Sequence, residues 1–249
     1  MSETQSAALE IPAPNVLVLV PTFNERANIR EVIERILAAG SEFSVLVIDD
    51  SSPDGTGEIA SRAAREFPDR VFVLHRGSKQ GIGRAYLAGF AWALPRDFTH
   101  FVTMDADLSH DPADLPRFLA DSQRADLVLG SRYVDGGSTE GWPRGRLALS
   151  WLGGHYAKTV LGVPVDDLTG GFKLYTRQAL ESLPLGEIRS DGYVFQIETT
   201  YRVLRTGLNV LEIPIRFVDR VAGKSKLSRK IVFEAIVVVW RLRLQRPAR

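Results

Sequence analysis

Five short apolar runs, separated by segments with helical spacing, limit this chain to a few folds. The runs are Val16–Val20, Val45–Ile48, Val71–Leu74, Phe101–Met104 and Leu127–Leu129. Continuous apolar runs of this length predict strands that are covered on both faces. Between them, apolar residues recur at three- and four-residue spacing, as in Ile29, Val32 and Ile33, which predicts helices. The alternation predicts an α/β fold, with a mainly parallel Rossmann-like sheet and helices on both faces.

The second half of the chain departs from this rhythm. A Gly-rich loop, Asp135–Gly145, precedes a helix predicted at about Leu147–Leu161. Further on, we predict two strands, Phe172–Tyr175 and Val210–Val218, on either side of a helix at about Phe195–Thr206. These elements elaborate the α/β core, because no internal repeat accompanies them.

The composition agrees with one self-sufficient globular domain. The chain has 249 residues, 45% of them hydrophobic, which is enough to form a stable hydrophobic core without disulfide cross-links. It has no cysteine, which excludes disulfides, thiolate metal sites and cysteine nucleophiles. No segment is polar enough for a linker, so we predict one domain over residues 15–226 after an unstructured lead-in at residues 1–14. The lead-in has no secretion signal, so we expect the protein to stay in the cytoplasm.

The C-terminal segment is strongly basic. Residues 220–249 hold nine Lys or Arg and one Glu, a formal charge of +8, so residues 1–219 carry −7 of the net +1. We predict an amphipathic helix in residues 227–249 that docks on the cytoplasmic face of the membrane or on a membrane-embedded partner protein. The alternative is packing on the body of the protein. Its apolar stretch Ile231–Trp240 is too short to span a bilayer.

Two carboxylates follow the predicted strand Phe101–Met104. Asp105 and Asp107 would lie at the carboxyl end of a buried strand, the edge where ligands of parallel sheets bind. A solvated turn would also accommodate this triplet. However, carboxylates held this close repel each other unless a cation lies between them, and a hard divalent ion that bridges diphosphate oxygens is a common partner. The pattern therefore favours a metal site, to which Ser109 adds a hydroxyl.

Two further strand ends carry polar residues. Asp49 and Asp50 follow the second run, and Asp50 is the better candidate to accept from a nucleobase or ribose hydroxyl. Phe23 and Glu25 follow the first run and are candidates for base and ribose contacts. Asn24 between them is explained by the start of a helix, as its N-cap.

Several other classes of protein are excluded. In Gly81–Tyr86 a tyrosine stands where the third glycine of a dinucleotide fingerprint belongs, so close helix packing is the better explanation. The four histidines have no ligand spacing, and neither a Walker sequence nor a Gly-x-Ser-x-Gly elbow is present. The basic residues of the C-terminal segment flank an apolar stretch and do not interleave with aromatics, so we expect no nucleic acid as partner.

Seven motifs in order resemble the dolichyl-phosphate (polyprenyl-phosphate) mannosyltransferases within glycosyltransferase family 2. They are Pro-Thr-Phe-Asn-Glu at 21–25, Asp-Asp-Ser-Ser-Pro-Asp-Gly-Thr at 49–56, Asp-Ala-Asp-Leu-Ser-His at 105–110, Gly-Ser-Arg-Tyr at 130–133, Asp-Leu-Thr-Gly-Gly-Phe at 167–172, Gly-Tyr-Val-Phe-Gln at 192–196 and Val-Asp-Arg-Val-Ala-Gly-Lys-Ser-Lys at 218–226. The resemblance implies a GT-A fold and inverting transfer of mannose from GDP-mannose to a polyprenyl phosphate. The alternatives are a polyprenyl-phosphate glucosyltransferase or another family 2 transferase with a UDP-sugar donor, and a non-catalytic binding subunit.

The resemblance also implies roles for individual residues. The donor site would comprise Pro21, Phe23, Glu25, Ile48, Asp50, Asp105, Ala106, Asp107, Arg132, Arg220 and Lys226. Phe23 departs from the family pattern, which often has Tyr there, and this puts one donor hydrogen bond in doubt. Asp105, Asp107 and, more weakly, Ser109 would hold Mg²⁺ or Mn²⁺. Family members also carry transmembrane helices after this region in some cases, and this sequence has none.

For the acceptor phosphate, the resemblance implies Arg132 together with Arg146 and Ser150, which lie four residues apart on one helical face. The catalytic residues would be Asp107, Arg132, Arg220 and Lys226, with the segment around Lys226 closing over the diphosphate. A phosphate monoester has a second pKa of about 6 and is largely dianionic at pH 7, so it requires no general base. Asp166 and Asp167 are the reserve candidates for a base if the acceptor is a sugar hydroxyl.

Overall fold

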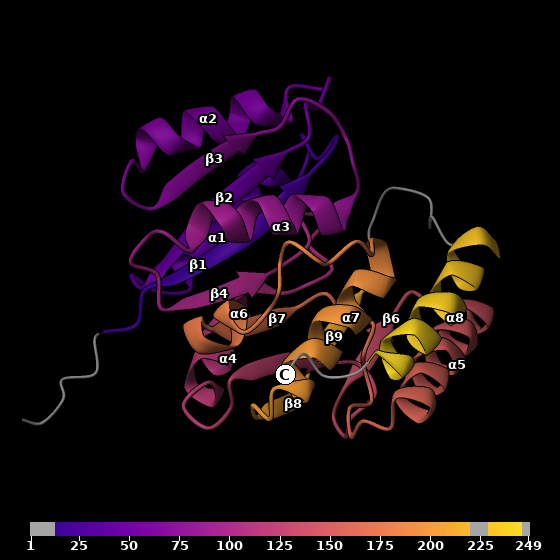
Figure 1. The fold of residues 1–249 in the computed structure, drawn as a ribbon. Coiled ribbons are helices and arrows are strands. Elements are labelled where there is room, and N and C mark those ends of the chain that lie inside the picture. The colour runs from indigo at the N-terminus through magenta and orange to yellow at the C-terminus, as the bar shows by residue number, and fades with distance from the viewer. Residues whose placement is uncertain (1–12, 220–228, 246–249) are drawn as a thin grey trace, which may run out of the picture.

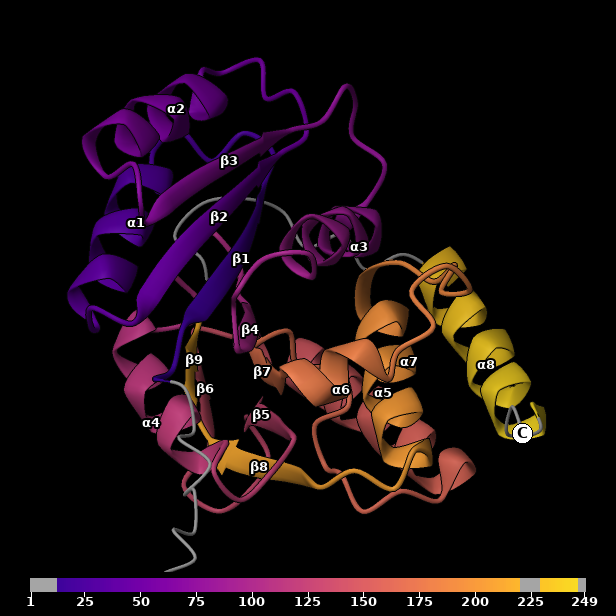
Figure 2. The same cartoon turned by 60° about the vertical axis from the view of Figure 1, so that its left-hand side comes forward.

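The computed structural model describes residues 13–219 and 229–245, the latter by its backbone alone up to residue 235. Its main sheet has seven strands in the order β3-β2-β1-β4-β7-β5-β8 (Figures 1 and 2). The strands are β1 Val16–Thr22, β2 Phe43–Asp49, β3 Val71–His75, β4 His100–Thr103, β5 Leu127–Ser131, β7 Lys173–Thr176 and β8 Val210–Pro214. Only β7 is antiparallel to its neighbours, so the expected mainly parallel α/β sheet is confirmed.

Helices cover both faces of this sheet (Figure 2). They are α1 Ile29–Ala38, α2 Thr56–Glu66, α3 Ile82–Ala93, α4 Leu115–Asp121, α5 Arg144–Leu161, α6 Arg177–Glu181, α7 Gly192–Arg205 and α8 Arg229–Leu244, with a 3₁₀ turn at Pro112–Asp114. Successive strand residues alternate between two cores. Val18 packs in the core that includes α1, α2 and α4, and Leu19 packs in the core that includes α3 and α7. This explains why the strand sequences are apolar throughout.

One predicted strand is in fact two. Residues 210–218 form β8 in the main sheet and then β9, Arg216–Val218, which pairs in parallel with β6, Ser138–Glu140, in a separate ribbon. Pro214 stands at the break, and proline cannot donate to a strand ladder. The amide of Ile215 still donates to the carbonyl of Ser131, after which the chain changes partner. The apolar pattern continues across the break, which is why the sequence did not reveal it.

The C-terminal helix lies against the body of the protein. Helix α8 packs on α5 and α7, with Val239 and Leu242 buried. In the described part of the chain, no helix is both long enough and apolar enough to cross a bilayer.

Candidate active site

A cleft of about 470 Å³ opens at the carboxyl ends of β1, β2 and β4. The loops that follow these three strands form one wall, and residues near β9, the start of α5 and the start of α7 form the other. Of the residues predicted from the sequence, the lining includes Pro21, Phe23, Glu25, Asp50, Asp105, Ala106, Asp107, Ser109, Arg132 and Arg146. These residues are spread over 126 positions of the sequence, and the parallel sheet brings them to one edge.

The carboxylates of Asp105 and Asp107 line the cleft in a tight turn after β4. The backbone N–H of Ser109 donates to Asp107 Oδ1 at 3.1 Å, and Leu108 between them adopts φ +60°. A left-handed conformation costs about 1–2 kcal/mol at a residue with a side chain. The turn therefore holds these two acidic residues close together at the mouth of the sheet at the expense of local backbone strain.

The donor atoms of this turn fit a hard divalent cation. The described residues contain no group of three or more His, Cys, Asp or Glu arranged to hold a metal. Mg²⁺ is usually bound by one or two carboxylates together with substrate phosphates and water, not by a complete protein cage. Two carboxylates and the Ser109 hydroxyl beside an open cleft meet that requirement.

His110 is a site residue that the sequence did not single out. It is 2% exposed and stacks on Phe172, with ring centroids 5.0 Å apart. Burial lowers the pKa of His110 to about 4, so the ring is neutral at pH 7. Its Nδ1 accepts the backbone N–H of Asp105 at 3.2 Å, which places the ring proton on Nε2. The neutral ring thereby fixes the backbone of the carboxylate turn.

Phe23, Glu25 and Asp50 lie together in the lining of the cleft, after the ends of β1 and β2. The ammonium of Lys79 lies 3.8 Å from the centroid of the Phe23 ring, and Glu25 accepts from Asn28 Nδ2 at 3.0 Å. Asp50 is ion-paired with Arg76 at 2.7 Å. These residues offer an aromatic face and charged groups of both signs to a ligand.

Three residues near these strand ends, Asn24, Asp49 and Ile48, have other conformations or contacts than the sequence predicted. Helix α1 begins at Ile29, and Asn24 does not cap it but adopts φ +62°, a conformation that asparagine tolerates. Asp49 accepts from the hydroxyls of Thr22 and Ser52 and so stabilises the turn. The side chain of Ile48 is fully buried in the core and lies outside the lining of the cleft.

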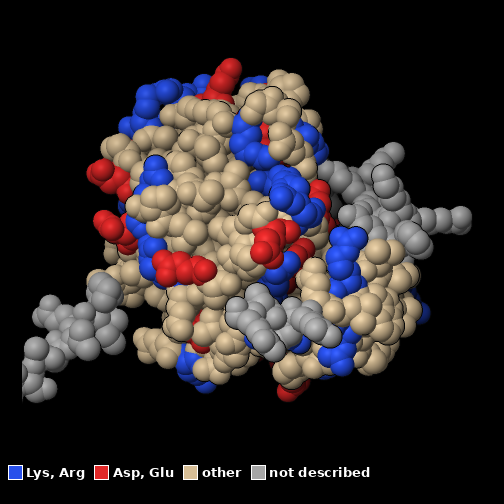
Figure 3. All heavy atoms as spheres, viewed as in Figure 1, with Lys and Arg blue, Asp and Glu red and all other residues tan. Residues whose placement is uncertain are grey.

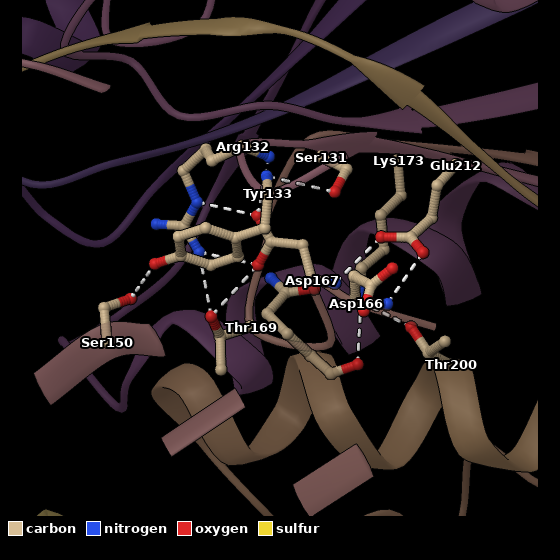
Figure 4. A network of polar contacts seen from close by, with 11 residues as sticks. Ser131, Arg132, Tyr133, Ser150, Asp166, Asp167, Thr169, Lys173, Thr200 and Glu212 are labelled. Atoms are coloured by element: carbon tan, nitrogen blue, oxygen red, sulfur yellow. Dashed lines mark hydrogen bonds and ion pairs between the residues drawn. The ribbon is translucent and has the colours of Figure 1, made fainter. Parts of the chain in front are cut away.

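A buried ion pair fixes Arg132 in the lining of the cleft (Figure 4). Its Nε and Nη2 donate to the two carboxylate oxygens of Asp167, each at 2.7 Å, and Nη2 also donates to Thr169 at 2.8 Å. Burial alone would raise the pKa of Asp167, but the charge and hydrogen bonds of Arg132 outweigh it and lower that pKa. Among the described residues Nη1 of Arg132 has no hydrogen-bond acceptor, so this edge remains available in the cleft wall.

The loop that supplies Asp167 is itself anchored (Figure 4). The carboxylate of Glu212 accepts the backbone N–H groups of Asp166 and Asp167 at 2.7 and 2.8 Å. Asp167 is completely buried, and the exposed Asp166 is ion-paired with Lys158. Neither aspartate lines the cleft, so the structure does not support the reserve hypothesis of a base at these positions.

Of the predicted pair Arg146 and Ser150, both in α5, only Arg146 lines the cleft. Arg146 lines the cleft, stacks on Trp142 with its guanidinium carbon 4.1 Å from the ring centroid, and is ion-paired with Asp219 at 2.9 Å. Ser150 lies outside the lining and accepts from the hydroxyl of Tyr133 at 2.8 Å (Figure 4). The predicted residues Arg220 and Lys226 lie outside the described residues.

The second half of the chain also contributes polar groups to the cleft that the sequence did not indicate. The side chains of Trp142 and Gln196 line it, and within the described part of the chain their buried Nε1 and Oε1 atoms have no hydrogen-bond partner. Buried polar groups without partners are uncommon, and in a cleft wall they suit a ligand with hydroxyl or phosphate groups. Gly83 packs closely against the segment before α7, because a Cβ there would lie 2.8 Å from the carbonyl oxygen of Ser190, and its N–H donates to Asp191 at 2.6 Å. Gln196 lies in one of the seven motifs, but nothing local indicated that it faces the site.

Comparisons with known proteins agree with this architecture. The family model described as glycosyl transferase family 2 matches residues 17–183. A polyprenol monophosphomannose synthase of Mycolicibacterium smegmatis is 46% identical over 235 residues, which cover 93% of this chain and 89% of that protein. An undecaprenyl-phosphate mannosyltransferase of Micrococcus luteus is 46% identical over 226 residues, or 91% of this chain and 93% of that protein.

Among solved structures, a glucosyl-3-phosphoglycerate synthase from Mycobacterium tuberculosis, in complex with Mn²⁺, uridine diphosphate and glucosyl-3-phosphoglycerate, has the same fold. Its TM-score is 0.67 at 20% identity, with 94% of this chain and 81% of that chain covered. The family match spans most of the central sheet, including the carboxylate turn and the arginine that Asp167 holds. This chain therefore belongs to glycosyltransferase family 2.

Proposed function

We propose that this chain is an inverting mannosyltransferase that moves mannose from GDP-mannose to a polyprenyl phosphate and releases GDP. The observation that carries the proposal is that one cleft is lined both by a pair of carboxylates, Asp105 and Asp107, and by two arginines, Arg132 and Arg146. Carboxylates suit a metal-bound diphosphate, and arginines suit a phosphate acceptor. The two curated relatives at 46% identity support mannose as the sugar and a polyprenyl phosphate as the acceptor.

Asp105 and Asp107 would hold the divalent ion, Mg²⁺ or Mn²⁺, with Ser109 as an additional contact. Bound there, the ion would neutralise charge that develops on the leaving diphosphate. Phe23 offers an aromatic face to the guanine base, and Asp50 and Glu25 offer carboxylates to ribose or base hydrogen-bond donors. Arg220 and Lys226 remain proposed contacts of the diphosphate.

The acceptor phosphate would bind to Nη1 of Arg132 and to Arg146. One of its oxygens forms a bond to the anomeric carbon of mannose, while the bond from that carbon to the diphosphate oxygen breaks on the opposite face, so the configuration inverts. A dianionic phosphate attacks without losing a proton, so the proposed reaction requires no aspartate as a general base. We also propose that the reaction takes place at the cytoplasmic face of the membrane.

The test is to incubate the purified chain with radiolabelled GDP-mannose, polyprenyl phosphate and Mg²⁺ or Mn²⁺, and to measure label in the lipid phase. Transfer that requires the acceptor phosphate and stops with chelator supports the proposal. Parallel reactions with UDP-glucose test the alternative donor. Transfer from UDP-glucose in place of GDP-mannose, or tight donor binding without turnover, would overturn it.

A further inference from the structure

Trp142 lies beside both arginines that line the cleft. Its ring centroid is 4.1 Å from the guanidinium carbon of Arg146 and 5.2 Å from that of Arg132. An aromatic face attracts a cation, and among the aromatic side chains tryptophan does so most strongly. One indole ring therefore contacts both guanidinium groups and restricts the distance between them.

Aromatic packing fixes the orientation of this ring. Phe217 of β9 meets Trp142 edge to face, with ring centroids 5.5 Å apart and an angle of 74° between the rings. Phe217 also meets His110 edge to face, with centroids 5.4 Å apart. Edge-to-face contacts at these distances are a preferred geometry for aromatic pairs. Because His110 accepts from the backbone of Asp105, the three rings connect the carboxylate turn to the indole.

The ribbon of β6 and β9 is bonded to the site at two further points. The backbone N–H of Val218 donates to the carbonyl of Ser109 at 3.3 Å, which ties β9 to the carboxylate turn. Asp219, the next residue, accepts from Arg146 at 2.9 Å, and its own N–H donates to the carbonyl of Glu140 at the end of β6. The ribbon thus sets the position of the indole relative to both the carboxylates and the arginines.

The indole N–H of Trp142 is a donor for which the described chain provides no acceptor. Its Nε1 atom is buried in the lining of the cleft, although the side chain as a whole is partly exposed. An indole nitrogen donates and does not accept, so only an acceptor atom can satisfy it. Buried Trp N–H groups usually have such a partner. An acceptor atom of a bound ligand would satisfy this donor.

Positive charge alone does not define a phosphate site in this protein. Figure 3 shows Lys and Arg interspersed with Asp and Glu over the face in view. In the cleft, Arg132 and Arg146 are likewise paired with Asp167 and Asp219. Each aspartate offsets part of the attraction that its arginine exerts on an anion. A neutral donor beside the two arginines adds a hydrogen bond for which no carboxylate competes.

The chemistry of these three side chains favours a phosphate over a sugar hydroxyl. Guanidinium groups and an indole N–H are all donors. A phosphate monoester has three strongly accepting oxygens and can receive several such bonds at once. A hydroxyl also has a proton to donate and would require an acceptor in the same place.

We propose that Trp142 contacts the substrate: its Nε1 donates to an oxygen of the acceptor phosphate, and its ring keeps Arg132 and Arg146 at the spacing at which both reach that phosphate. The inference rests on the proposed function, because that function identifies the phosphate as the acceptor. It assigns to the ribbon of β6 and β9 the task of holding the indole in place.

The first experiment separates the N–H from the ring. Trp142→Phe retains an aromatic face and removes the donor. We expect the KM for the acceptor to rise at least about tenfold, because a hydrogen bond to a charged group is lost, while kcat and the KM for the donor change less than about twofold. Trp142→Ala also removes the ring between the arginines, so it should lower kcat about tenfold in addition.

The matched control is Trp92→Phe. Trp92 also stacks on an arginine, with the guanidinium carbon of Arg96 3.6 Å from its ring centroid, but it lies outside the lining of the cleft. This variant should have the kinetics of the unaltered chain, and circular dichroism melts should show that all three variants are folded. An unchanged acceptor KM in Trp142→Phe would overturn the inference. A rise in the donor KM in place of the acceptor KM would also overturn it, because the N–H would then serve the nucleotide diphosphate.

A second measurement detects the contact without turnover. The chain has four tryptophans, so Trp92→Phe/Trp151→Phe/Trp240→Phe retains Trp142 alone. Its fluorescence emission should shift on addition of geranyl phosphate, a short and water-soluble prenyl phosphate, and should not shift with geraniol, which lacks the phosphate. No shift with geranyl phosphate, or an equal shift with geraniol, would contradict the proposed contact. If the triple variant does not fold, the difference between the spectra of the unaltered chain and Trp142→Phe gives the same information.

The two measurements distinguish failure of this inference from failure of the proposed function. A shift with geranyl phosphate in a chain that transfers no mannose would count against the proposed function alone. Mannosyl transfer with an unchanged acceptor KM in Trp142→Phe would count against the role of Trp142 alone.

Discussion

Replacement of Asp167 by asparagine tests whether a buried ion pair holds the key arginine of the cleft. In the native structure both carboxylate oxygens accept from Arg132, and both side chains are almost completely buried, at 0% and 5% exposure. Asparagine retains one acceptor oxygen and removes the charge, so the guanidinium is left buried without its counter-ion. Removal of one member of such a pair costs about 3–5 kcal/mol, and solvent screening is too weak here to reduce that figure much. This is a large part of the about 5–15 kcal/mol by which a domain is typically stable.

The effect should depend on pH with a definite sign. The pKa of Asp167 in the folded protein lies below its ordinary value of 3.8 because Arg132 favours the charged form over the penalty of burial. Its contribution is therefore present above the unfolded pKa, including pH 7, and is lost as pH falls through the folded pKa. The difference between the unaltered chain and Asp167→Asn should be full at pH 7 and smaller at pH 3.

The assay is urea unfolding followed by circular dichroism at both pH values, together with steady-state kinetics at temperatures where both proteins are folded. We expect the KM for the acceptor to rise and kcat to fall while the KM for the donor changes little, because Nη1 of Arg132 loses its fixed direction. The control is Asp166→Asn, an exposed neighbour whose ion pair with Lys158 contributes about 0–1 kcal/mol. Stability of Asp167→Asn within about 1 kcal/mol of the unaltered chain at pH 7 would refute the assignment.

Three further changes test other parts of the site and fold. Asp105→Asn and Asp107→Asn should each lower mannosyl transfer at least about a hundredfold without lowering the melting temperature, and normal turnover in either variant would remove the proposed metal site. The buried Oε1 of Gln196 has no hydrogen-bond partner among the described residues. Gln196→Leu should therefore raise the stability slightly, and it should lower kcat/KM by about tenfold if this oxygen binds a ligand. Unchanged kinetics would show that Oε1 contacts no ligand. Burial lowers the pKa of Lys173 in the folded protein well below its ordinary value of about 10.4. At a pH between these two pKa values the side chain takes up a proton when the protein unfolds. The stability of the folded protein therefore rises with pH in this range. Lys173→Met should lack this rise in urea midpoints between pH 7 and 9, and an equal rise in both proteins would contradict the reasoning.

The first half of the fold, from β1 to β5, was predictable because its pattern is local. Each strand is short, continuous and apolar, each helix has regular spacing, and their alternation leaves a parallel sheet as the simple solution. The same logic placed Asp50, Asp105 and Asp107 at one edge, because each of them follows the end of a parallel strand. It failed at residues 210–218, where Pro214 ends one pairing and the apolar pattern continues into another sheet.

The arrangement around Arg132 and Arg146 depended on contacts between residues far apart in the chain. Arg132 meets Asp167 across 35 positions, and Arg146 meets Asp219 across 73. A sequence shows the charges but not the pairing, so Asp167 was a candidate base until burial and its two bonds to Arg132 showed a structural role. His110, Trp142 and Gln196 were equally hidden, because each is an ordinary residue until the sheet and α7 bring it to the cleft.

The amino-acid sequence alone determined the fold class, the family resemblance and the position of the carboxylates, because periodicity and strand ends are properties of neighbouring residues. Only the tertiary structure decided which charged groups neutralise each other, which remain directed at a ligand, and which apolar side chains stay uncovered. Those outcomes depend on burial and on distances between separate elements, and neither quantity exists until the chain has folded.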